Sequence, residues 1–214
     1  MTAWDTSVFG LIQRVQAQTS YLHPFAAAFA LWGGLVLMAA FVMGCWWFAA
    51  RRRPDADRAV AVLALTGVAS VVGLLTNQRL LSPYVGRPRP CRVLPSAHVL
   101  VPCTDDYSMP SDHAVVAGAL AVGLIIFSRR IGALVGLIAV LLAAARVYVG
   151  VHYPSDVLVG LGVGGSISAM MIATFVAPTR RLCMMMSAGR LRWLVRSAQH
   201  RAAADVSKPS VHVP

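Results

Sequence analysis

Glutamate is absent from this sequence of 214 residues, and lysine occurs once, as Lys208. Only 13% of the residues are charged and 57% are hydrophobic, whereas a soluble domain carries about 25% charged residues. This shortage of charge, together with long apolar runs, excludes an ordinary soluble domain and indicates an integral membrane protein. Arginine supplies nearly all of the positive charge, and the net charge is +11. Because the arginines flank apolar runs instead of gathering on one soluble face, we expect no nucleic-acid partner.

Cysteine is scarce as well, and its spacing matches no metal-ligand pattern. Of the four cysteines, Cys45 lies in an apolar run, Cys183 in the basic tail, and Cys91 and Cys103 in one polar loop. Because of this spacing we expect no metal, and we also expect no bound cofactor.

The N-terminus lacks a basic start followed by an apolar run and a cleavage site, so we expect no signal peptide.

Five apolar segments have lengths near the ~20 residues that span a bilayer. They cover residues 24–50, 59–82, 112–128, 131–149 and 155–177. The long polar connection is 83–111. The pattern predicts an all-α integral membrane protein, a bundle of five transmembrane helices, or of six if the N-terminal segment joins it. Accordingly, we divide the chain into an N-terminal amphipathic segment (1–22), a transmembrane domain (23–178) and a basic cytoplasmic tail (179–214).

Two flanking segments are amphipathic. Apolar residues recur at helical spacing in residues 3–16, and they are Trp4, Val8, Leu11, Ile12 and Val15. This segment either lies on the membrane surface or packs as a short sixth helix. In residues 183–200, Arg190, Arg192 and Arg196 are interleaved with apolar side chains. That pattern is typical of a basic helix near anionic lipid or of a solvated basic tail.

Lysine and arginine are distributed unevenly between the two ends of the expected bundle. One end holds thirteen of the nineteen, namely Arg51, Arg52, Arg53, Arg58, Arg129, Arg130, Arg180, Arg181, Arg190, Arg192, Arg196, Arg201 and Lys208. The positive-inside rule makes this end cytoplasmic. The N-terminus and the loop 83–111 then face the outside of the plasma membrane. The other six are Arg14, Arg79, Arg87, Arg89, Arg92 and Arg146, and they need a different explanation.

The first polar cluster on the outer side is GRPRPCR, residues 86–92. Each arginine that precedes a proline is pushed toward an extended conformation, and each proline fixes its own φ. The segment therefore presents Arg87 and Arg89 stiffly, and their guanidinium groups suit phosphate oxygens. A polar loop with no binding role is the alternative.

The second cluster is MPSDHA, residues 109–114, where the third apolar segment begins. Ser111 or Asp112 is a candidate N-cap, and a helix N-terminus offers free backbone N–H groups to an anion. His113 falls in the first turn. The alternative interpretation is a simple cap beside a surface histidine.

The third cluster consists of Arg146, His152 and Asp156. An arginine at membrane depth is costly and is normally paired or functional. The spacing of four residues, across a turn that contains Pro154, can let the carboxylate bond one imidazole nitrogen and leave the other free. The alternative is a turn in which Ser155 or Asp156 caps the next helix.

In order and spacing, the three clusters resemble the motifs of the type 2 phosphatidic acid phosphatase superfamily, which includes lipid phosphatases and vanadium haloperoxidases. The family pattern is Lys, six residues, Arg-Pro; then Pro-Ser-Gly-His; then Ser-Arg, five residues, His, three residues, Asp. The matching residues are Arg89, Pro90, Pro110, Ser111, His113, Arg146, His152 and Asp156. The resemblance covers residues 59–177 and implies the helical core of that family.

The sequence departs from the family pattern at three positions. Ser82 stands in place of lysine, Asp112 in place of glycine and Ala145 in place of serine. The second and third motifs are most similar to the bacitracin-resistance type of undecaprenyl-diphosphate phosphatase. Arg79 lies about one helical turn before Ser82, and we expect it to reach the oxygen that the family lysine contacts.

The resemblance implies a role for each site residue. His152 is expected to be the nucleophile that forms a phosphohistidine, and Asp156 to hold its tautomer. His113 is expected to protonate the leaving group. Binding of the phosphoryl group falls to Arg87, Arg89, Arg146, Ser111 and, by our own inference, Arg79. Such a mechanism needs no metal.

Three functions are consistent with this reading. The first is hydrolysis of a polyprenyl diphosphate, of undecaprenyl or decaprenyl type, to the monophosphate, which recycles a carrier for cell-wall glycans. The second is hydrolysis of phosphatidic acid or phosphatidylglycerol phosphate. The third is a non-catalytic lipid-binding protein or transporter on the same fold. On the outer side, Cys91 and Cys103 either form a disulfide or remain free thiols.

Overall fold

The computed structural model describes residues 3–187 and 192–195, and every regular element in this part of the chain is a helix. Four helical stretches are long and apolar enough to cross a membrane, and a fifth apolar helix is shorter. The four are Ser20–Arg52, Ala56–Val93, Arg129–Tyr148 and Pro154–Ser187, and the shorter one is Asp112–Phe127. The expected all-α bundle with five apolar helices is therefore confirmed, and the chain is a multi-pass membrane protein.

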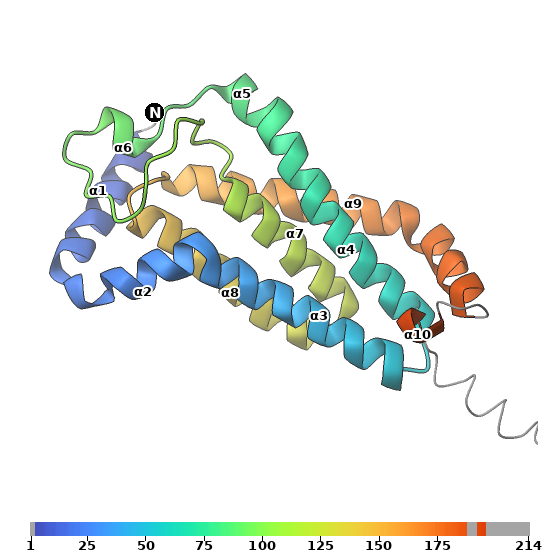
Figure 1. Ribbon diagram of the computed structural model, residues 1–214. Coiled ribbons are helices and arrows are strands. Elements are labelled where there is room, and N and C mark those ends of the chain that lie inside the picture. Colours follow the sequence, from blue (N-terminus) through green and yellow to red (C-terminus); the bar gives the residue numbers. More distant parts are fainter. Residues whose placement is uncertain (1–2, 188–191, 196–214) are drawn as a thin grey trace, which may run out of the picture.

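Figure 1 shows the apolar helices of the bundle side by side along one axis. They are α3 (Gly34–Arg52), α4 (Ala56–Thr76), α7 (Asp112–Phe127), α8 (Arg129–Tyr148) and α9 (Pro154–Ser187). The other helices lie at the ends of the bundle, namely α1 (Ala3–Gln18), α2 (His23–Ala28), α5 (Ser82–Val85), α6 (Pro90–Val93) and α10 (Arg192–Val195). Single turns of other helix types connect α2 to α3 (Phe29–Gly33) and α4 to α5 (Asn77–Leu81).

The shortest apolar helix, α7, lies at the centre of the bundle and packs against α4, α8 and α9. Its sequence is rich in alanine and glycine, and most of its residues are buried. At Gly118 of α7 and Gly164 of α9, an added Cβ would collide with a backbone carbonyl of the facing helix. These small residues let the two helices approach closely, as in other membrane helix pairs. The short helix is thus fixed by its neighbours, and it carries the second polar cluster at its N-terminus.

At one end of the bundle, α1 crosses the helices instead of running along them (Figure 1). It is not among the helices long and apolar enough to span. Its polar residues Asp5, Gln13 and Gln16 are buried, whereas Trp4 and Leu11 are each about half exposed. Three residues of the apolar stripe, Trp4, Leu11 and Val15, are thus exposed, and the buried polar residues face the bundle.

The buried polar face of α1 satisfies backbone groups at the end of α8. Gln16 donates its side-chain N–H to the carbonyl of Tyr148 (2.7 Å), and Gln13 donates to the same oxygen (3.3 Å). A further bond runs from the backbone N–H of His98 to Gln13 Oε1 (2.8 Å). A helix leaves its last carbonyls without partners inside the helix, so these glutamines stabilise the end of α8 and explain why polar residues of α1 face the bundle.

At the opposite end, α9 extends ten residues beyond the expected boundary at 177. It continues through Pro178 to Ser187, where Cys183 packs against Ala50, Val60 and Val195. Arg180 also donates to Asp57 of α4 (2.6 Å). These contacts outweigh the helix-breaking tendency of proline. Most of the basic tail, including Arg190 and Arg196, lies outside the described residues.

Candidate active site

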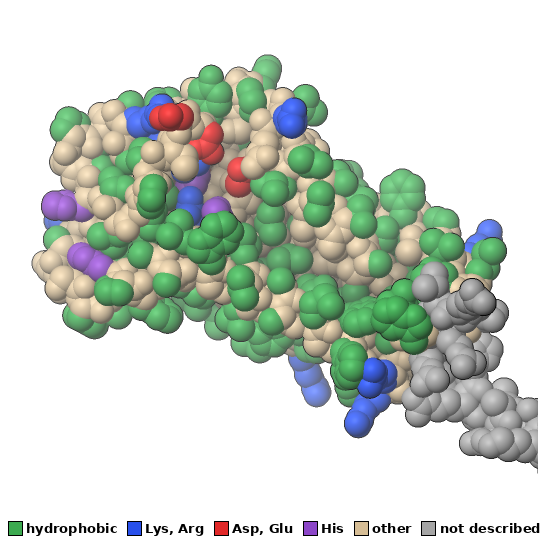
Figure 2. Space-filling view, viewed as in Figure 1, with side chains coloured by type: hydrophobic (Ala, Val, Ile, Leu, Met, Phe, Trp, Pro, Cys, Tyr) green, Lys and Arg blue, Asp and Glu red, His purple; other side chains and the backbone are tan. Residues whose placement is uncertain are grey.

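The three polar clusters meet at the end of the bundle that carries α1. Figure 2 shows acidic, arginine and histidine side chains gathered at that end, whereas the bundle beyond it is mostly apolar on the visible face. The loop 86–111, the N-terminus of α7 and the turn between α8 and α9 supply these residues. Segments far apart in the sequence therefore build one polar site.

His152 is at the centre of this site and is 1% exposed. Its Nδ1 lies 2.9 Å from the carbonyl oxygen of Ser108, and its Nε2 lies 3.0 Å from Arg89 Nη1 and 3.4 Å from Arg146 Nη2. A carbonyl only accepts and a guanidinium only donates. Nδ1 therefore carries the proton, and the Nε2 lone pair points at two arginines.

Charge and burial keep this imidazole neutral. Burial, reinforced by the positive charges of Arg146 and Arg89, lowers the pKa of His152 well below 6.5. Both effects disfavour the protonated ring. At neutral pH, Nε2 is consequently available to act as a nucleophile.

The structure corrects the expected partner of the histidine. Asp156 Oδ2 lies 3.7 Å from His152 Nδ1, which is beyond hydrogen-bond distance. The bond that fixes the tautomer goes to the backbone of Ser108 instead. Asp156 accepts hydrogen bonds from the Ser108 hydroxyl and from the backbone N–H of Tyr153 (2.7 Å). The carboxylate thus acts on the histidine through the loop that holds Nδ1.

Arg87, expected to bind the phosphoryl group, is occupied elsewhere. Its Nη1 donates to Asp156 Oδ1 (2.8 Å) and to Ser155 Oγ (2.6 Å), and its Nη2 donates to Asp5 Oδ2 (2.9 Å). The guanidinium also stacks over the Tyr153 ring, 4.1 Å from its centroid. Both terminal nitrogens bond carboxylates and no bond joins Arg87 to His152, so in this structure Arg87 links α1 to Asp156.

Arg89 and Arg146 do face the histidine. Arg89 is 5% exposed and Arg146 is 6% exposed. Arg89 Nη1 also donates to the carbonyl of Val151 (3.2 Å), and Arg146 Nη1 donates to the carbonyl of Ala30 (3.2 Å). These backbone bonds fix the planes of both guanidinium groups beside Nε2, as electrostatic stabilisation of a phosphoryl group requires.

The second cluster places two further side chains near the site. Ser111 is fully buried, its hydroxyl has no hydrogen-bond partner among the described residues, and its backbone N–H donates to the carbonyl of Asp156 (3.1 Å). Only the hydroxyl is therefore available to a ligand. His113 is half-buried, and its Nε2 lies 3.0 Å from the carbonyl of Leu31. That contact places a proton on Nε2 and leaves Nδ1 as its second proton-exchanging atom.

The departures from the family pattern have a structural counterpart at the end of α4. Asn77 and Gln78 donate to the two carboxylate oxygens of Asp112 (2.7 and 2.8 Å). Arg79, in contrast, is exposed, and no hydrogen bond or ion pair joins it to the described residues of the site. The position of Arg79 therefore does not support the expectation that it replaces the family lysine. Ser82, which stands at the position of that lysine, is buried and carries no charge.

Sequence reasoning missed Asp5, Ser108 and Asp106. Asp5 accepts hydrogen bonds from the backbone N–H (3.0 Å) and hydroxyl (2.7 Å) of Ser155. Burial raises the pKa of Asp5, but these bonds and Arg87 outweigh it and lower the pKa. Asp5 is the only acidic residue of α1, and that was the available signal. Ser108 acts through its carbonyl, which has no sequence signature.

The polar loop is closed by a disulfide between Cys91 and Cys103. Within it, Arg92 pairs with Asp105, and Thr104 donates to Asp106. The bridge anchors the loop directly beside Arg89. It thereby limits how far the loop can move from the site.

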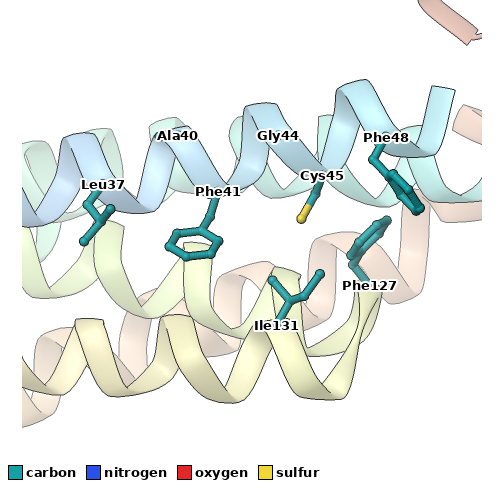
Figure 3. Close-up of a pocket in the computed structure, with 8 residues that line it drawn as sticks. All are labelled: Leu37, Ala40, Phe41, Gly44, Cys45, Phe48, Phe127 and Ile131. Carbon is teal, nitrogen blue, oxygen red and sulfur yellow. The ribbon is translucent and has the colours of Figure 1, made fainter. Parts of the chain in front are cut away.

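Two cavities contrast in chemistry. A cavity of about 220 Å³ is lined by Arg89, Asp106, Asp112, Gln78 and Ser82, among others. A second cavity, of about 410 Å³, lies between α3 and the α7–α8 turn, where Phe41, Phe127 and Ile131 point into it (Figure 3). No ionisable side chain other than the thiol of Cys45 lines this second cavity, so it offers nothing to a phosphoryl group.

Among the described residues, no three His, Cys, Asp or Glu side chains are arranged to hold a metal ion.

Comparison with known proteins gives independent findings. The model of the PAP2 superfamily matches residues 58–180. Undecaprenyl-diphosphatase BcrC of Bacillus subtilis (strain 168) is 36% identical over 92 residues, which cover 43% of this chain and 47% of that protein. An undecaprenyl-diphosphatase of Sulfolobus acidocaldarius is 36% identical over 102 residues, covering 47% and 50%. These matches span about half the length of the curated relatives.

A solved structure resembles most of the chain. The crystal structure of Aquifex aeolicus LpxE superposes with a TM-score of 0.57 at 25% identity, and covers 80% of this chain and 96% of that one. The similarity therefore includes the arrangement of the helices as well as the sequence motifs.

Proposed function

Since the chain belongs to the PAP2 superfamily, we propose that it is a membrane phosphatase that hydrolyses a polyprenyl diphosphate to the monophosphate and inorganic phosphate. The observation that carries the chemistry is the unprotonated Nε2 of His152 facing Arg89 and Arg146. A phosphoryl group bound by these arginines would lie beside a neutral nucleophile. Two relatives named undecaprenyl-diphosphatase support the choice of substrate.

The proposed reaction has two steps. The Nε2 lone pair of His152 attacks the terminal phosphorus, the bond to the bridging oxygen breaks, and His113, which enters the step protonated at both ring nitrogens, gives its Nδ1 proton to the leaving lipid monophosphate. A water molecule, which loses a proton to His113, then attacks the phosphohistidine and releases inorganic phosphate. Arg89, Arg146 and the Ser111 hydroxyl stabilise the charge on the phosphoryl oxygens.

The proposed orientation places this site outside the plasma membrane. The exposed arginines Arg51, Arg52, Arg58, Arg129 and Arg130 lie at the end opposite α1 (Figure 1). The positive-inside rule favours that end for the cytoplasm. Labelling of single cysteines introduced at residues 7 and 130 with a membrane-impermeant reagent tests this, and labelling of residue 130 alone in intact cells would contradict it.

The function is tested by phosphate release from a lipid panel. Undecaprenyl diphosphate, undecaprenyl phosphate, phosphatidic acid and phosphatidylglycerol phosphate are compared, with His152→Ala as the inactive control. We expect release from the diphosphate, and we expect it to persist in a strong chelator. Release only from the glycerolipid monophosphates would replace the proposed substrate, and release from none would favour a non-catalytic lipid-binding role.

A further inference from the structure

A carboxylate already occupies one edge of Arg89. Asp106 accepts from Arg89 Nε at 3.1 Å and from Nη2 at 2.8 Å. The remaining Nη1 faces His152 and the carbonyl of Val151. Every donor-bearing nitrogen of this guanidinium is therefore engaged, and its only anionic partner is Asp106 among the described residues.

This two-bond arrangement is also how an arginine holds phosphate. Asp106 is anionic at neutral pH, because hydrogen bonds from Arg89 and Thr104 outweigh burial and lower its pKa. A phosphoryl group that uses the same edge of Arg89 must displace this carboxylate. Two anions on one edge would repel each other at short range.

Asp106 is placed where it can leave. Its side chain is 52% exposed, whereas that of Arg89 is 6% exposed. Both residues line the cavity of about 220 Å³ beside the site. Asp106 lies between the disulfide at Cys103 and Ser108, whose carbonyl holds His152. The carboxylate can turn toward the open cavity while both ends of its short loop remain anchored.

We propose that Asp106 sets the phosphate affinity of the site by exchanging with the phosphoryl group at Arg89. The carboxylate leaves this edge when substrate enters and returns as inorganic phosphate departs. Asp106 does not contact the reacting atoms, so it is an affinity-setting residue and not a catalytic one. The inference rests on the proposed function only in assigning the phosphoryl group to Arg89.

Exchange has a consequence for turnover. A buried site with Arg89, Arg146 and no competing anion would hold the inorganic phosphate product tightly, and release would then limit the rate. A resident carboxylate weakens substrate and product alike and shortens the occupancy of the product. Weaker binding of the substrate raises KM. Weaker binding of the phosphate product keeps product release from lowering kcat.

The test compares Asp106→Asn with Asp105→Asn in the purified full chain. Asp105 lies on the same loop, and its side chain is 97% exposed and pairs with Arg92, so its variant removes an equal charge away from Arg89. We expect the inhibition constant of inorganic phosphate to fall about tenfold in Asp106→Asn, since a charged hydrogen-bonding competitor is lost. KM should fall as well, and kcat should not rise. The control should match the wild type.

A second measurement does not require turnover. Orthovanadate binding, followed as a thermal shift in detergent, should tighten about tenfold in Asp106→Asn and in Asp106→Ser. Unchanged or weaker binding of both anions would overturn the proposal and make Asp106 a residue that merely orients Arg89. Tightened vanadate binding in a chain that hydrolyses none of the lipids would leave the exchange standing and reject the proposed function.

Discussion

The two ends of the bundle both carry arginines, but among the described residues only the end with α1 buries any of them. At the end with α1, Arg89 and Arg146 are buried beside His152. At the other end, Arg51, Arg130 and Arg180 are exposed. Burying a guanidinium costs free energy unless carboxylates and carbonyls compensate it. At the end with α1, partners from several elements supply this compensation. Buried and compensated arginines of this kind indicate a functional site, whereas exposed arginines can reflect membrane orientation alone.

At the other end, the arginines are exposed or partly exposed, and among the described residues each pairs with at most one carboxylate. Arg53 pairs with Asp55 two residues away (2.7 Å), and Arg180 pairs with Asp57. Exposed pairs of this kind contribute little. What these arginines share is their position at one end of the bundle, and the positive-inside rule depends on that position. The comparison therefore predicts that equal substitutions at the two ends have very different effects.

The largest difference is expected for Arg146→Lys against Arg130→Lys. Lysine keeps the charge but cannot bond both the Ala30 carbonyl and a group at His152 Nε2, as Arg146 does. We expect kcat/KM to fall about 100-fold at residue 146 and to stay within about twofold at residue 130. Steady-state phosphate release measures both. Equal effects at the two positions would remove the distinction between the ends.

Asp5→Asn is expected to have the next largest effect. Loss of its charge weakens the brace that runs through Arg87 to Asp156, and we expect kcat to fall about tenfold. Asp5 is separated from the phosphoryl position by Arg87, so orthovanadate affinity should stay unchanged. The matched control is Thr6→Ala, because Thr6 is the next residue of α1 and its hydroxyl bonds only the carbonyl of Ala3, in an exposed contact. A loss of vanadate affinity equal to the loss of kcat would indicate general disruption of the site.

Sequence patterns predicted the apolar helices well because bilayer thickness dictates segment length and hydropathy. They left open how α1 packs and did not predict that α9 continues to Ser187, because tertiary contacts decide which side of a helix faces inward and how far it continues. The polar glutamines of α1 face the bundle because α8 ends there with free carbonyls. No local pattern within residues 3–16 reports that.

The site shows the same division. The order and spacing of the motifs predicted that Arg89, Arg146 and His152 lie close together, and the structure has them in contact. Arg87 and Arg89 occupy equivalent Arg-Pro positions in the sequence, yet one faces Asp5 and the other faces His152. Their roles diverge because Asp5 approaches from a helix more than 80 residues away, and such a contact leaves no trace in the motif itself.

Removal of the disulfide is expected to affect stability more than activity. The bridge closes a loop of about a dozen residues between Cys91 and Cys103, which in the entropic account contributes about 3 kcal/mol. The double variant Cys91→Ser with Cys103→Ser should lower the melting temperature and reduce kcat/KM about threefold, because Ser108 and Asp106 lie just beyond the bridge. Cys45→Ser at the other end is the control. An unchanged melting temperature would contradict the prediction.

A smaller effect is expected from pH. Burial, Arg146 and Arg89 lower the pKa of His152 well below 6.5, so the imidazole stays unprotonated as the pH falls through 6.5. From pH 7.5 to 6.0, kcat/KM should change less than about twofold, whereas an ordinary imidazole would lose about fourfold. A pH profile on a substrate whose own phosphate ionisation is titrated separately checks this. An acid limb centred at 6.5 would show that the site does not keep His152 neutral.

The smallest effect is expected at the pair that joins α4 and α9. Arg180 donates to Asp57 at 2.6 Å, but its side chain is 50% exposed, and water screens such a pair. Arg180→Gln retains a hydrogen-bond donor, so kcat/KM should remain within about 1.5-fold of the wild type at 50 and at 500 mM salt. The apparent inhibition constant of inorganic phosphate should likewise be unaffected. A loss comparable with that of Asp5→Asn would mean that the two ends of the bundle are energetically coupled through α9, whose first turn carries Asp156.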